Sequence, residues 1–481
     1  MSTTQCVAAA GAPEEASARR WLQVHGGAVK CVRGLAVDVE SGEGVPGCDL
    51  AAGRLSALLA GLPALTSIKW MDLRADMHRR PAAAIRAFLA GAARAIARCS
   101  SLHALCLHIV LLGGLADQLP GALVRELASV RSLEDLFMSI YTNEANRLDW
   151  PAIPSVAHLT ADLAALPRLR ALTLVIGTVR MEATLPASMS RLAQLTMLSL
   201  RGFDGLRCEL GWARLPALEC LDFCECVFAC DGEDALPRMD TLVNLSSYHL
   251  WNCPSLRVLP ASLWRLPQLR GLHHHTDKGV VTGAARSELP VAGLPLSAPC
   301  FASMHGLSLS GHNLPAFPLG ILSMACLVYL NLSHSCFEQL PEGVSVLTAL
   351  EELRLGRHSA GAVQVGGALD ARALGGLAGL PNLRELGFAN CSVLLCSSFQ
   401  AAAAHPRLER VQLDTSHPAP GLSCTAFLGF VSALLQRGRP TVLELTDSVV
   451  QGAGRRDSRD FRGALRAVGY PLSDSDSADL V

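Results

Sequence analysis

The feature that most constrains this chain is a short leucine pattern that recurs along most of its length. A clear copy, LPASMSRLAQLTMLSLRGF, runs from Leu185 to Phe203, and near copies begin at Leu259 and Leu340. Their shared skeleton is L-P-x-x-φ-x-x-L-x-x-L-x-x-L-x-L, in which φ is an apolar residue. Self-similarity at a period of about 20 to 50 residues is typical of stacked repeats rather than of separate globular domains.

Fourteen segments fit the L-x-x-L-x-L core of this pattern, and each is numbered here from its first apolar residue, the anchor. The spacing between anchors is uneven and averages about 29 residues, which lies within the usual range of solenoid repeats. The anchors are Val32, Leu65, Leu102, Leu133, Leu169, Leu195, Leu218, Leu245, Leu269, Met304, Leu327, Leu350, Leu383 and Leu408.

In the L-x-L core, both leucines point to one side of a short strand and the residue between them points to the other. One such strand cannot bury its apolar side alone, so neighbouring repeats stack into a parallel sheet over a leucine core. Proline after the first leucine fits an irregular return turn, whereas Pro81 to Cys99 has the composition and spacing of a helix. We therefore predict an α/β fold, a solenoid whose parallel sheet faces one side and whose helices and irregular turns face the other.

These repeats resemble the leucine-rich repeat family, and the resemblance implies a curved horseshoe with the sheet on its concave face. The third position after the L-x-L core usually holds Asn or Cys in that family and bonds backbone groups at the bend of the solenoid. Cysteine at this position is similar to F-box-type repeats, whereas the L-P-x-x-φ repeats are similar to plant intracellular and Ras-group-related repeats. The residues at this position here are Cys226, Cys253, Cys391, Ser335 and Ser416.

The pattern covers most of the chain and leaves polar ends. We expect a disordered N-terminus over residues 1–20, a solenoid of about 13 to 14 irregular repeats over residues 21–447, and a polar, mostly disordered tail over residues 448–481. Loop insertions are predicted near residues 276–303 and 356–376. The segment from Ala18 to Val39 is predicted to form a helix leading into the first strand, and Thr441 to Asp447 a last strand.

Composition narrows the possible functions. The formal net charge of the 481 residues is -1, which lacks the basic footprint of a general nucleic-acid binder, so we expect no nucleic-acid partner. No apolar run is long enough to suggest a membrane span, and no export signal is visible. The 17 cysteines are therefore expected as thiols in the cytoplasm, with the nucleus or the cytoskeleton and cilium axoneme as alternatives. We also expect a monomer.

No phosphate loop, zinc-protease motif, nucleophile elbow or kinase signature occurs in the chain, so we predict a non-enzymatic protein without a cofactor or catalytic residue. The residues two, four and six positions after each anchor should face the concave side. On that register Asp222, His249 and His273 lie side by side on neighbouring strands, within reach of a common metal ion. The cysteine spacing nearby does not match usual zinc ligand pairs, so no metal site is predicted.

The preferred interpretation of this region is a protein contact centred on Trp251, because Trp is enriched among residues that dominate binding energy. The chain is thus expected to be an interaction scaffold that grips a partner protein through the concave face. The alternatives are a substrate-recognition subunit of an F-box-like ubiquitin ligase without a visible F-box, a GTPase regulator, or a leucine-rich protein of the cytoskeleton or cilium. The candidate contact residues are Asp222, His249, Trp251, His273, His275, Tyr329, Asn331, Glu352, Arg354 and Arg410.

Overall fold

The structure of the chain is a computed structural model. It describes residues 26–39, 46–76, 82–112, 124–142, 163, 166–177, 184–185, 187–209, 214–230, 232–256, 259–276, 294–312, 314–335, 337, 340–357, 375–389, 405–414 and 442–445. The chain comprises two compact units, Met1–Leu266 and Pro267–Val481, and each is described by itself.

The N-terminal unit is built on parallel strands that pair in the order β1, β3, β4, β5, β6, β8, β10 and β11, with β2 also paired to β3. A small separate ladder joins β7 to β9. The strands are β1 (Cys31–Val32), β2 (Leu35–Val39), β3 (Ser67–Asp76), β4 (Ala104–Leu112), β5 (Asp135–Thr142), β6 (Ala171–Gly177), β7 (Thr184–Leu185), β8 (Met197–Arg201), β9 (Arg207–Cys208), β10 (Cys220–Cys224) and β11 (Ser247–Trp251).

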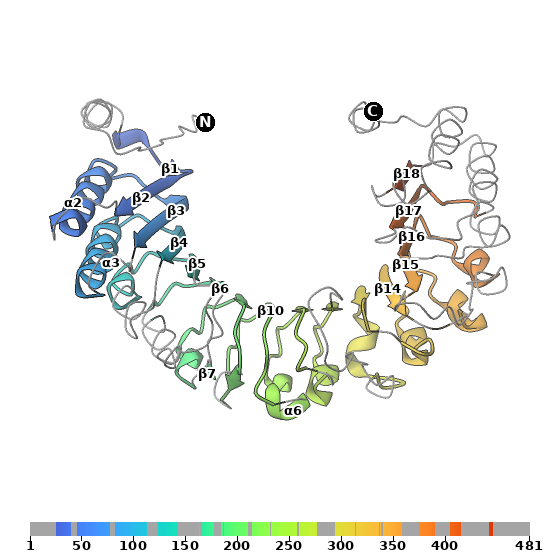
Figure 1. The fold of residues 1–481 in the computed structure, drawn as a ribbon. Coiled ribbons are helices and arrows are strands. Elements are labelled where there is room, and N and C mark those ends of the chain that lie inside the picture. Colours follow the sequence, from blue (N-terminus) through green and yellow to red (C-terminus); the bar gives the residue numbers. More distant parts are fainter. Residues whose placement is uncertain are drawn as a thin grey trace, which may run out of the picture. The chain divides into compact units, whose positions relative to one another are not determined.

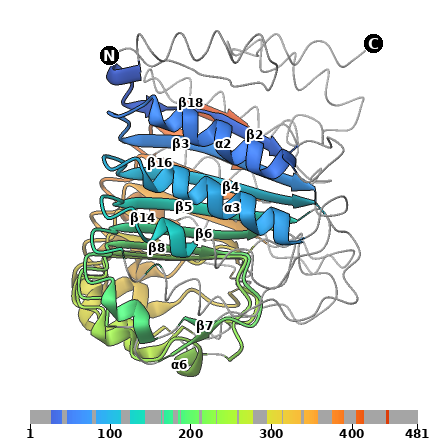
Figure 2. The same ribbon diagram turned by 90° about the vertical axis from the view of Figure 1, so that its left-hand side faces the viewer.

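Helices lie along one face of these strands, as Figure 1 and Figure 2 show for α2 (Pro46–Ala60) and α3 (Ala82–Ala97). Helix α3 confirms the helix predicted from Pro81 to Cys99. The two helices approach closely, because a Cβ added to Gly91 would lie 2.7 Å from the Cβ of Ala52. The later, shorter repeats return through α6 (Gly232–Ala235) and the 3₁₀ turns η2 (Ala187–Arg191), η3 (Met239–Thr241) and η4 (Ala261–Arg265), after the opening turn η1 (Gly26–Ala28).

The C-terminal unit repeats this plan with 3₁₀ turns as its described return segments. Its strands pair in parallel in the order β12 to β18. The strands are β12 (Gly271–His275), β13 (Gly306–Ser308), β14 (Tyr329–Ser335), β15 (Glu352–Arg357), β16 (Glu385–Ala389), β17 (Arg410–Asp414) and β18 (Val442–Leu445), and the turns are η6 (Pro299–Ala302), η7 (Leu319–Ser323), η8 (Glu342–Val346) and η9 (Gly375–Gly379). Strand β18 confirms the last strand predicted from Thr441 to Asp447.

Strand register confirms the leucine-rich repeat fold and thirteen of the fourteen anchors. Within each unit, the residue two positions after one anchor pairs with the residue two positions after the next. The anchor Val32 is wrong, because Val32 pairs with Ile68 and so takes the second leucine position of its repeat. The repeated spacing buries the core leucines whose side chains the structure describes, such as Leu198 and Leu200, which are fully shielded from solvent.

Strand β3 departs from the pattern at a β-bulge. Ile68 pairs with Leu105 and Met71 with Leu107, so Lys69 and Trp70 together oppose a single residue of β4. The extra residue moves Met71 into the core, where it is fully buried. The counting rule puts Met71, six positions after the anchor Leu65, on the concave side, and this prediction is wrong because an inserted residue reverses the side of every residue that follows it.

Two of the bend residues, Cys226 and Cys253, bond backbone groups as the family resemblance implies, whereas the hydroxyl of Ser335 is buried without a hydrogen-bond partner. The thiol of Cys226 donates to the carbonyl of Leu200 at 3.3 Å, and that of Cys253 to the carbonyl of Phe223 at 3.4 Å. At the same position of the repeat at Met304, the ring of His312 contacts the carbonyl of His274 at 3.2 Å. Cys391 and Ser416 lie outside the described residues.

The residue just before the bend position adopts the left-handed backbone conformation in several repeats. Its φ angle is 80° at Gly202 and 88° at Gly311. Glu225 and Asn252 take the same conformation with φ of 53°, and His334 with φ of 65°. Left-handed backbone is costly for a residue with a side chain, so the bend imposes this geometry on whatever residue occupies it.

The remaining boundary predictions have mixed outcomes. Within the predicted helix from Ala18 to Val39, the described residues form η1, β1 and β2 instead, because the alternation of Val32, Leu35 and Val37 suits a strand. Part of the insertion predicted near 276–303 is the turn η6, whose Cys300 is buried in the core. Residues 277–293 and 358–374, the N-terminus to residue 25 and the tail after 445 lie outside the described residues. None of the described helices has the length and hydropathy needed to cross a bilayer.

Candidate functional site

The predicted contact centre is partly assembled on the sheet face of the N-terminal unit. Asp222 on β10 pairs in register with His249 on β11, and Cys224 pairs with Trp251. The neighbouring strand places Ser199 beside Asp222. Asp222, His249 and Trp251 therefore lie together as the sequence predicted. His273 belongs to the other unit and is described there.

Short hydrogen bonds hold the two polar members of this centre. The hydroxyl of Ser199 donates to Oδ2 of Asp222 at 2.7 Å, and the hydroxyl of Ser247 lies 2.6 Å from Nε2 of His249. Burial lowers the pKa of His249, and the carboxylate of Asp222 partly opposes that shift. His249 is therefore a neutral imidazole at neutral pH, with its ring orientation set by a serine.

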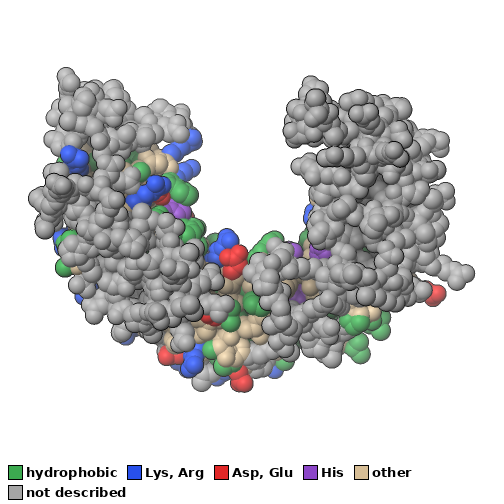
Figure 3. Space-filling view, viewed as in Figure 1, with side chains coloured by type: hydrophobic (Ala, Val, Ile, Leu, Met, Phe, Trp, Pro, Cys, Tyr) green, Lys and Arg blue, Asp and Glu red, His purple; other side chains and the backbone are tan. Residues whose placement is uncertain are grey.

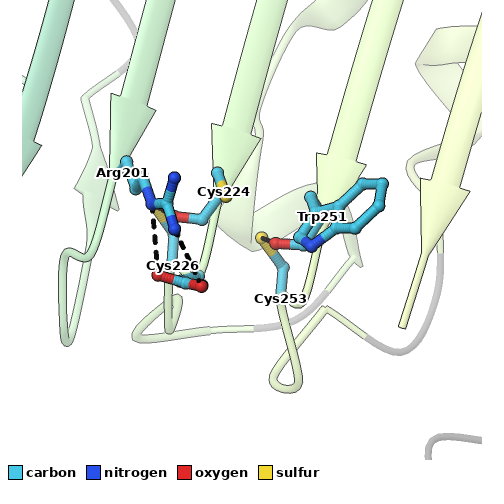
Figure 4. A network of polar contacts seen from close by, with 6 residues as sticks. Arg201, Cys224, Cys226, Trp251 and Cys253 are labelled. Atoms are coloured by element: carbon cyan, nitrogen blue, oxygen red, sulfur yellow. Dashed lines mark hydrogen bonds and ion pairs between the residues drawn. The ribbon is translucent and has the colours of Figure 1, made fainter. Parts of the chain in front are cut away.

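Trp251 is the most exposed part of this centre. Its side chain is 48% exposed at the end of β11, although Trp is usually well buried. Figure 4 shows Arg201, Cys224 and Trp251 at the ends of three neighbouring strands, with Cys226 and Cys253 in the bends that follow. The backbone N–H of Glu225 donates to the carbonyl of Trp251 at 2.6 Å, which ties the two strand ends together.

A charged pair lies at the ends of the two strands before β11. The guanidinium of Arg201 donates from Nε and Nη2 to the two carboxylate oxygens of Glu225, each at 3.2 Å. The hydrogen bond to Glu225 raises the pKa of Arg201. Both side chains are about half exposed, so the pair is a fixed polar rim beside an aromatic surface rather than a major source of stability.

In the C-terminal unit, aromatic side chains meet over a glycine. The rings of His273 on β12 and Tyr329 on β14 have centroids 5.9 Å apart, although β13 lies between their strands. They approach because β13 presents Gly306 at this point, and a Cβ there would contact both rings. His275 is half-buried at the end of β12.

The other predicted residues of this unit form a ladder of charges. Nε of Arg354 lies 2.6 Å from the carboxylate of Glu352, and the guanidinium of Arg354 stands 6.0 Å from the centre of the Tyr329 ring. Nη1 of Arg410 is likewise 2.6 Å from the carboxylate of Glu385. Asn331 instead accepts the backbone N–H of Ser333 at 2.9 Å through its own carbonyl oxygen, which stabilises the strand locally. These charges are paired within the face.

Counting from the anchors places His108 and Phe137 on the concave face but misses Trp70, which joins them in a second aromatic group on the N-terminal strands. The bulge on β3 exposes 47% of Trp70, whose ring stacks on His108 of β4 with centroids 3.6 Å apart. Phe137 of β5 lies on the other side of His108 at 5.2 Å. The signal was present in the run from Leu65 to Met71, where the last two apolar core residues stand three positions apart rather than two.

One cysteine and histidine pair in this group has the composition of a nucleophile and its base. The sulfur of Cys106 lies 3.3 Å from Nε2 of His108, and Ser139 Oγ lies 2.5 Å from Nδ1. Burial, followed by Asp135 and Asp72, raises the pKa of Cys106 to about 11. An activated cysteine needs the opposite shift, so the pair is a neutral hydrogen-bonded contact. Among the described residues, no three His, Cys, Asp or Glu side chains are arranged to hold a metal ion.

The chain was compared with known proteins. No protein-family model matches the sequence, and no curated protein matches it. Among solved structures, the chain is similar to a Leptospira interrogans LRR protein at 15% identity, covering 94% of this chain and 96% of that one with a TM-score of 0.49. It is similar to TLR13 in a complex with ssRNA13 at 17% identity, covering 82% of this chain and 52% of that one with a TM-score of 0.46.

A third similar structure is the plant peptide hormone receptor RGFR1 in complex with RGF2, at 13% identity, with 80% of this chain and 68% of that one covered and a TM-score of 0.31. The chain spans about half the length of the TLR13 chain. At these identities the similarity concerns the fold, which the strand register already establishes.

Proposed function

We propose that this chain, which is built of leucine-rich repeats, is a non-catalytic scaffold that binds a protein partner through its sheet face. The half-exposed Trp251 is the observation that carries the proposal. A Trp side chain buries a large apolar area on binding while its N–H still forms a hydrogen bond, and it loses little rotamer entropy. Such residues commonly dominate the energy of protein interfaces.

The surroundings of Trp251 support this role. Arg201 and Glu225 form a paired rim on one side, and His249 and Asp222 form a polar floor held by serine hydroxyls. An aromatic anchor ringed by satisfied polar groups is the usual anatomy of an interface core and its rim. In the C-terminal unit, the partner contact is proposed to use the group around Tyr329, where a histidine and an arginine flank the ring.

The eleven cysteines whose side chains the structure describes form no disulfide, and several lie buried as small apolar side chains. This supports residence in a reducing compartment, for which we propose the cytoplasm. No observation favours a ubiquitin-ligase adaptor, a GTPase regulator or a ciliary protein over a general scaffold, so the proposal stays with partner binding by a monomer.

The test is affinity purification of the intact chain beside the Trp251→Ala variant, with bound proteins identified and quantified by mass spectrometry. We expect the native chain to retain a defined partner and the variant to lose at least about nine-tenths of it, as for a dominant interface residue. Val243→Ala is the matched control, because Val243 is an apolar side chain that is 50% exposed but lies outside the strands.

Circular dichroism on both variants separates lost binding from lost folding. Equal retention of the same partner by the native chain, the Trp251 variant and the Val243 control, all folded, would show that the contact centre is wrong. A partner that survives Trp251→Ala but is lost on Tyr329→Ala would move the contact to the C-terminal unit.

A further inference from the structure

The bulged end of the N-terminal sheet carries a second contact surface, distinct from the one around Trp251. We name it the N-terminal patch and define it by Arg33, Lys69, Trp70, His108 and Phe137. We propose that this patch binds a short, extended, acidic segment of a partner protein that places an aromatic or proline ring on Trp70. The inference rests on the proposed function and names the chemistry of one part of the partner.

The bulge creates the patch. Ile68 and Met71 are both fully buried, yet the two residues between them, Lys69 and Trp70, are both exposed. A regular strand would turn only one of two successive side chains outward. Bulges re-aim side chains and are frequent beside functional sites. Here the bulge places a cation and an aromatic ring side by side on the sheet face.

The indole of Trp70 is held in one orientation. Its ring stacks on His108 at an interplanar angle of 27°, and His108 is itself buried. The two ring nitrogens of His108 lie within hydrogen-bond distance of Ser139 and Cys106, which fixes the imidazole beneath the indole. A side chain already fixed in its bound orientation loses little entropy on association, so the exposed face of Trp70 is a prepared surface.

Open space lies beside this ring. Leu35 pairs with Met71 and Val32 with Ile68, so Gly34 is the residue of the neighbouring strand segment that stands next to Trp70. A Cβ added to Gly34 would meet no atom within 4 Å. The patch therefore has an open space, which we call the shelf, above Gly34 and beside the indole of Trp70. A flat ring would fit in this space.

The charge of the patch selects an acidic occupant. By the same register Arg33 stands next to Lys69, and both side chains are exposed. Two cations on neighbouring strands, about 5 Å apart at the backbone, repel one another until an anion lies between them. Among the described residues, no carboxylate forms an ion pair with Arg33 or Lys69, whereas Arg74 farther along β3 is paired with Asp72.

Single-stranded nucleic acid is the other polymer that stacks on aromatic rings beside cations. The patch does not favour it, because the exposed carboxylate of Asp135 lies on β5, the strand that also carries Phe137. This carboxylate would face the repeated phosphates of a strand that crosses the sheet. An acidic peptide carries its charge over a few residues only and leaves the rest of the face to uncharged groups. Figure 3 shows Lys and Arg atoms beside hydrophobic and His atoms on this part of the surface.

The probe is a phage-displayed library of random dodecapeptides, selected on the full-length chain and sequenced after counter-selection on the Trp70→Ala variant. We expect the enriched peptides to be rich in Asp and Glu beside Tyr, Phe, Trp or Pro. Synthetic copies of them should bind at least tenfold more weakly to Trp70→Ala and to Arg33→Ala/Lys69→Ala, and the affinity should fall as salt rises.

Gly34→Phe is the second variant. It fills the shelf without removing any patch residue, and its added side chain meets open space, so it should fold normally and still lose the peptide. Arg168→Ala/Arg191→Ala is the matched charge control, since both arginines are exposed in the same unit away from the strands. This control and Trp251→Ala should bind the peptides as the native chain does.

Enrichment that is equal on the native chain and on Trp70→Ala would overturn the inference, as would selected peptides without an acidic bias. Binding of an oligo(dT) 20-mer that requires Trp70, with no peptide selected, would replace the acidic peptide by nucleic acid and also overturn it. If Trp251→Ala loses the protein partner while Trp70→Ala keeps it, this inference fails and the proposed function stands.

Discussion

A buried pair of histidines should make the C-terminal unit sensitive to acid. His274 of β12 occupies a core position that Leu309 and Leu332 fill in the next repeats, and it is fully buried. His312, also fully buried, packs against it with ring centroids 4.0 Å apart. Because a carbonyl oxygen only accepts, the contact from Nε2 of His312 to the carbonyl of His274 places the His312 proton on Nε2.

Neither ring has the partners that a cation would need. Both nitrogens of His274 and Nδ1 of His312 are buried without a hydrogen bond in the structure. Burial lowers the pKa of His274 well below its usual value, with contributions from His312 and His275, and burial lowers the pKa of His312 to about 3. Among the residues that the structure describes, no carboxylate acts on either ring to oppose the shift.

The direction in which stability changes with pH follows from which state of the chain, folded or unfolded, binds more protons. Well above pH 6.5 both histidines are neutral in the folded and the unfolded chain, so the free energy of unfolding does not depend on pH through them. Below pH 6.5 the unfolded chain takes up protons that the folded chain excludes, and folding weakens as the pH falls towards the folded pKa. From pH 7 to pH 5 this costs about 2 kcal/mol for His312 alone, and His274 adds a loss in the same direction.

The substitution His274→Leu places at this core position the leucine found in the next repeats, and it removes two buried nitrogens that have no hydrogen bond. We expect the free energy of unfolding to rise by about 1 to 3 kcal/mol at pH 7, and by more at pH 5. His312→Cys, the residue that holds this bend position in Cys226 and Cys253, should remove the other part of the acid sensitivity.

Hydrogen exchange measured by mass spectrometry on the segments Leu272–Thr276 and Leu307–His312 reports the local stability of this region, separately from the N-terminal unit. Rates must first be corrected for the intrinsic pH dependence of exchange. A less protected His274→Leu chain at pH 7, or native protection that is the same at pH 5 and pH 7, would refute the reasoning.

Three further predictions concern the solenoid itself, each measured by urea unfolding. Gly202→Ala should destabilise the chain by about 2 kcal/mol or more, because its backbone is left-handed and its new Cβ would clash with the carbonyl of Ile176. Gly34→Ala should change stability by less than about 1 kcal/mol, since its Cβ enters open space, so equal effects at the two glycines would contradict the geometry. Cys226→Ala should cost about 1 kcal/mol by leaving the carbonyl of Leu200 without its thiol donor, and no loss would mean that the bend does not need the bond.

The candidate site was partly visible in the sequence. Counting positions from each anchor places Asp222 beside His249 and Cys224 beside Trp251, and the strand register agrees. The same counting fails at Trp70, because a bulge inserts one residue and reverses the sides of those after it. Regular alternation along a strand does not predict a bulge, although the three-residue spacing from Ile68 to Met71 indicates one.

Local features also depended on neighbours that are distant in sequence. His273 and Tyr329 are separated by more than fifty residues, and they meet because the strand between them carries Gly306. Likewise, Glu352 and Arg354 pair along one strand, whereas Arg410 pairs across strands with Glu385. Alternating charges on a strand face permit either arrangement, so the sequence indicated charged surfaces without their pairings.

By itself the sequence determined the repeat, the parallel strands and the leucines of the core, because one apolar period repeated many times leaves a single way to bury it. It also indicated the bend cysteines, whose position in the repeat is fixed by that period. Only the tertiary structure decided which polar side chains touch, which aromatic rings stay exposed, and that the His274 and His312 rings face each other in the core. These outcomes depend on packing between repeats, where a bulge or one glycine changes the neighbours of a side chain without changing the period that the sequence displays.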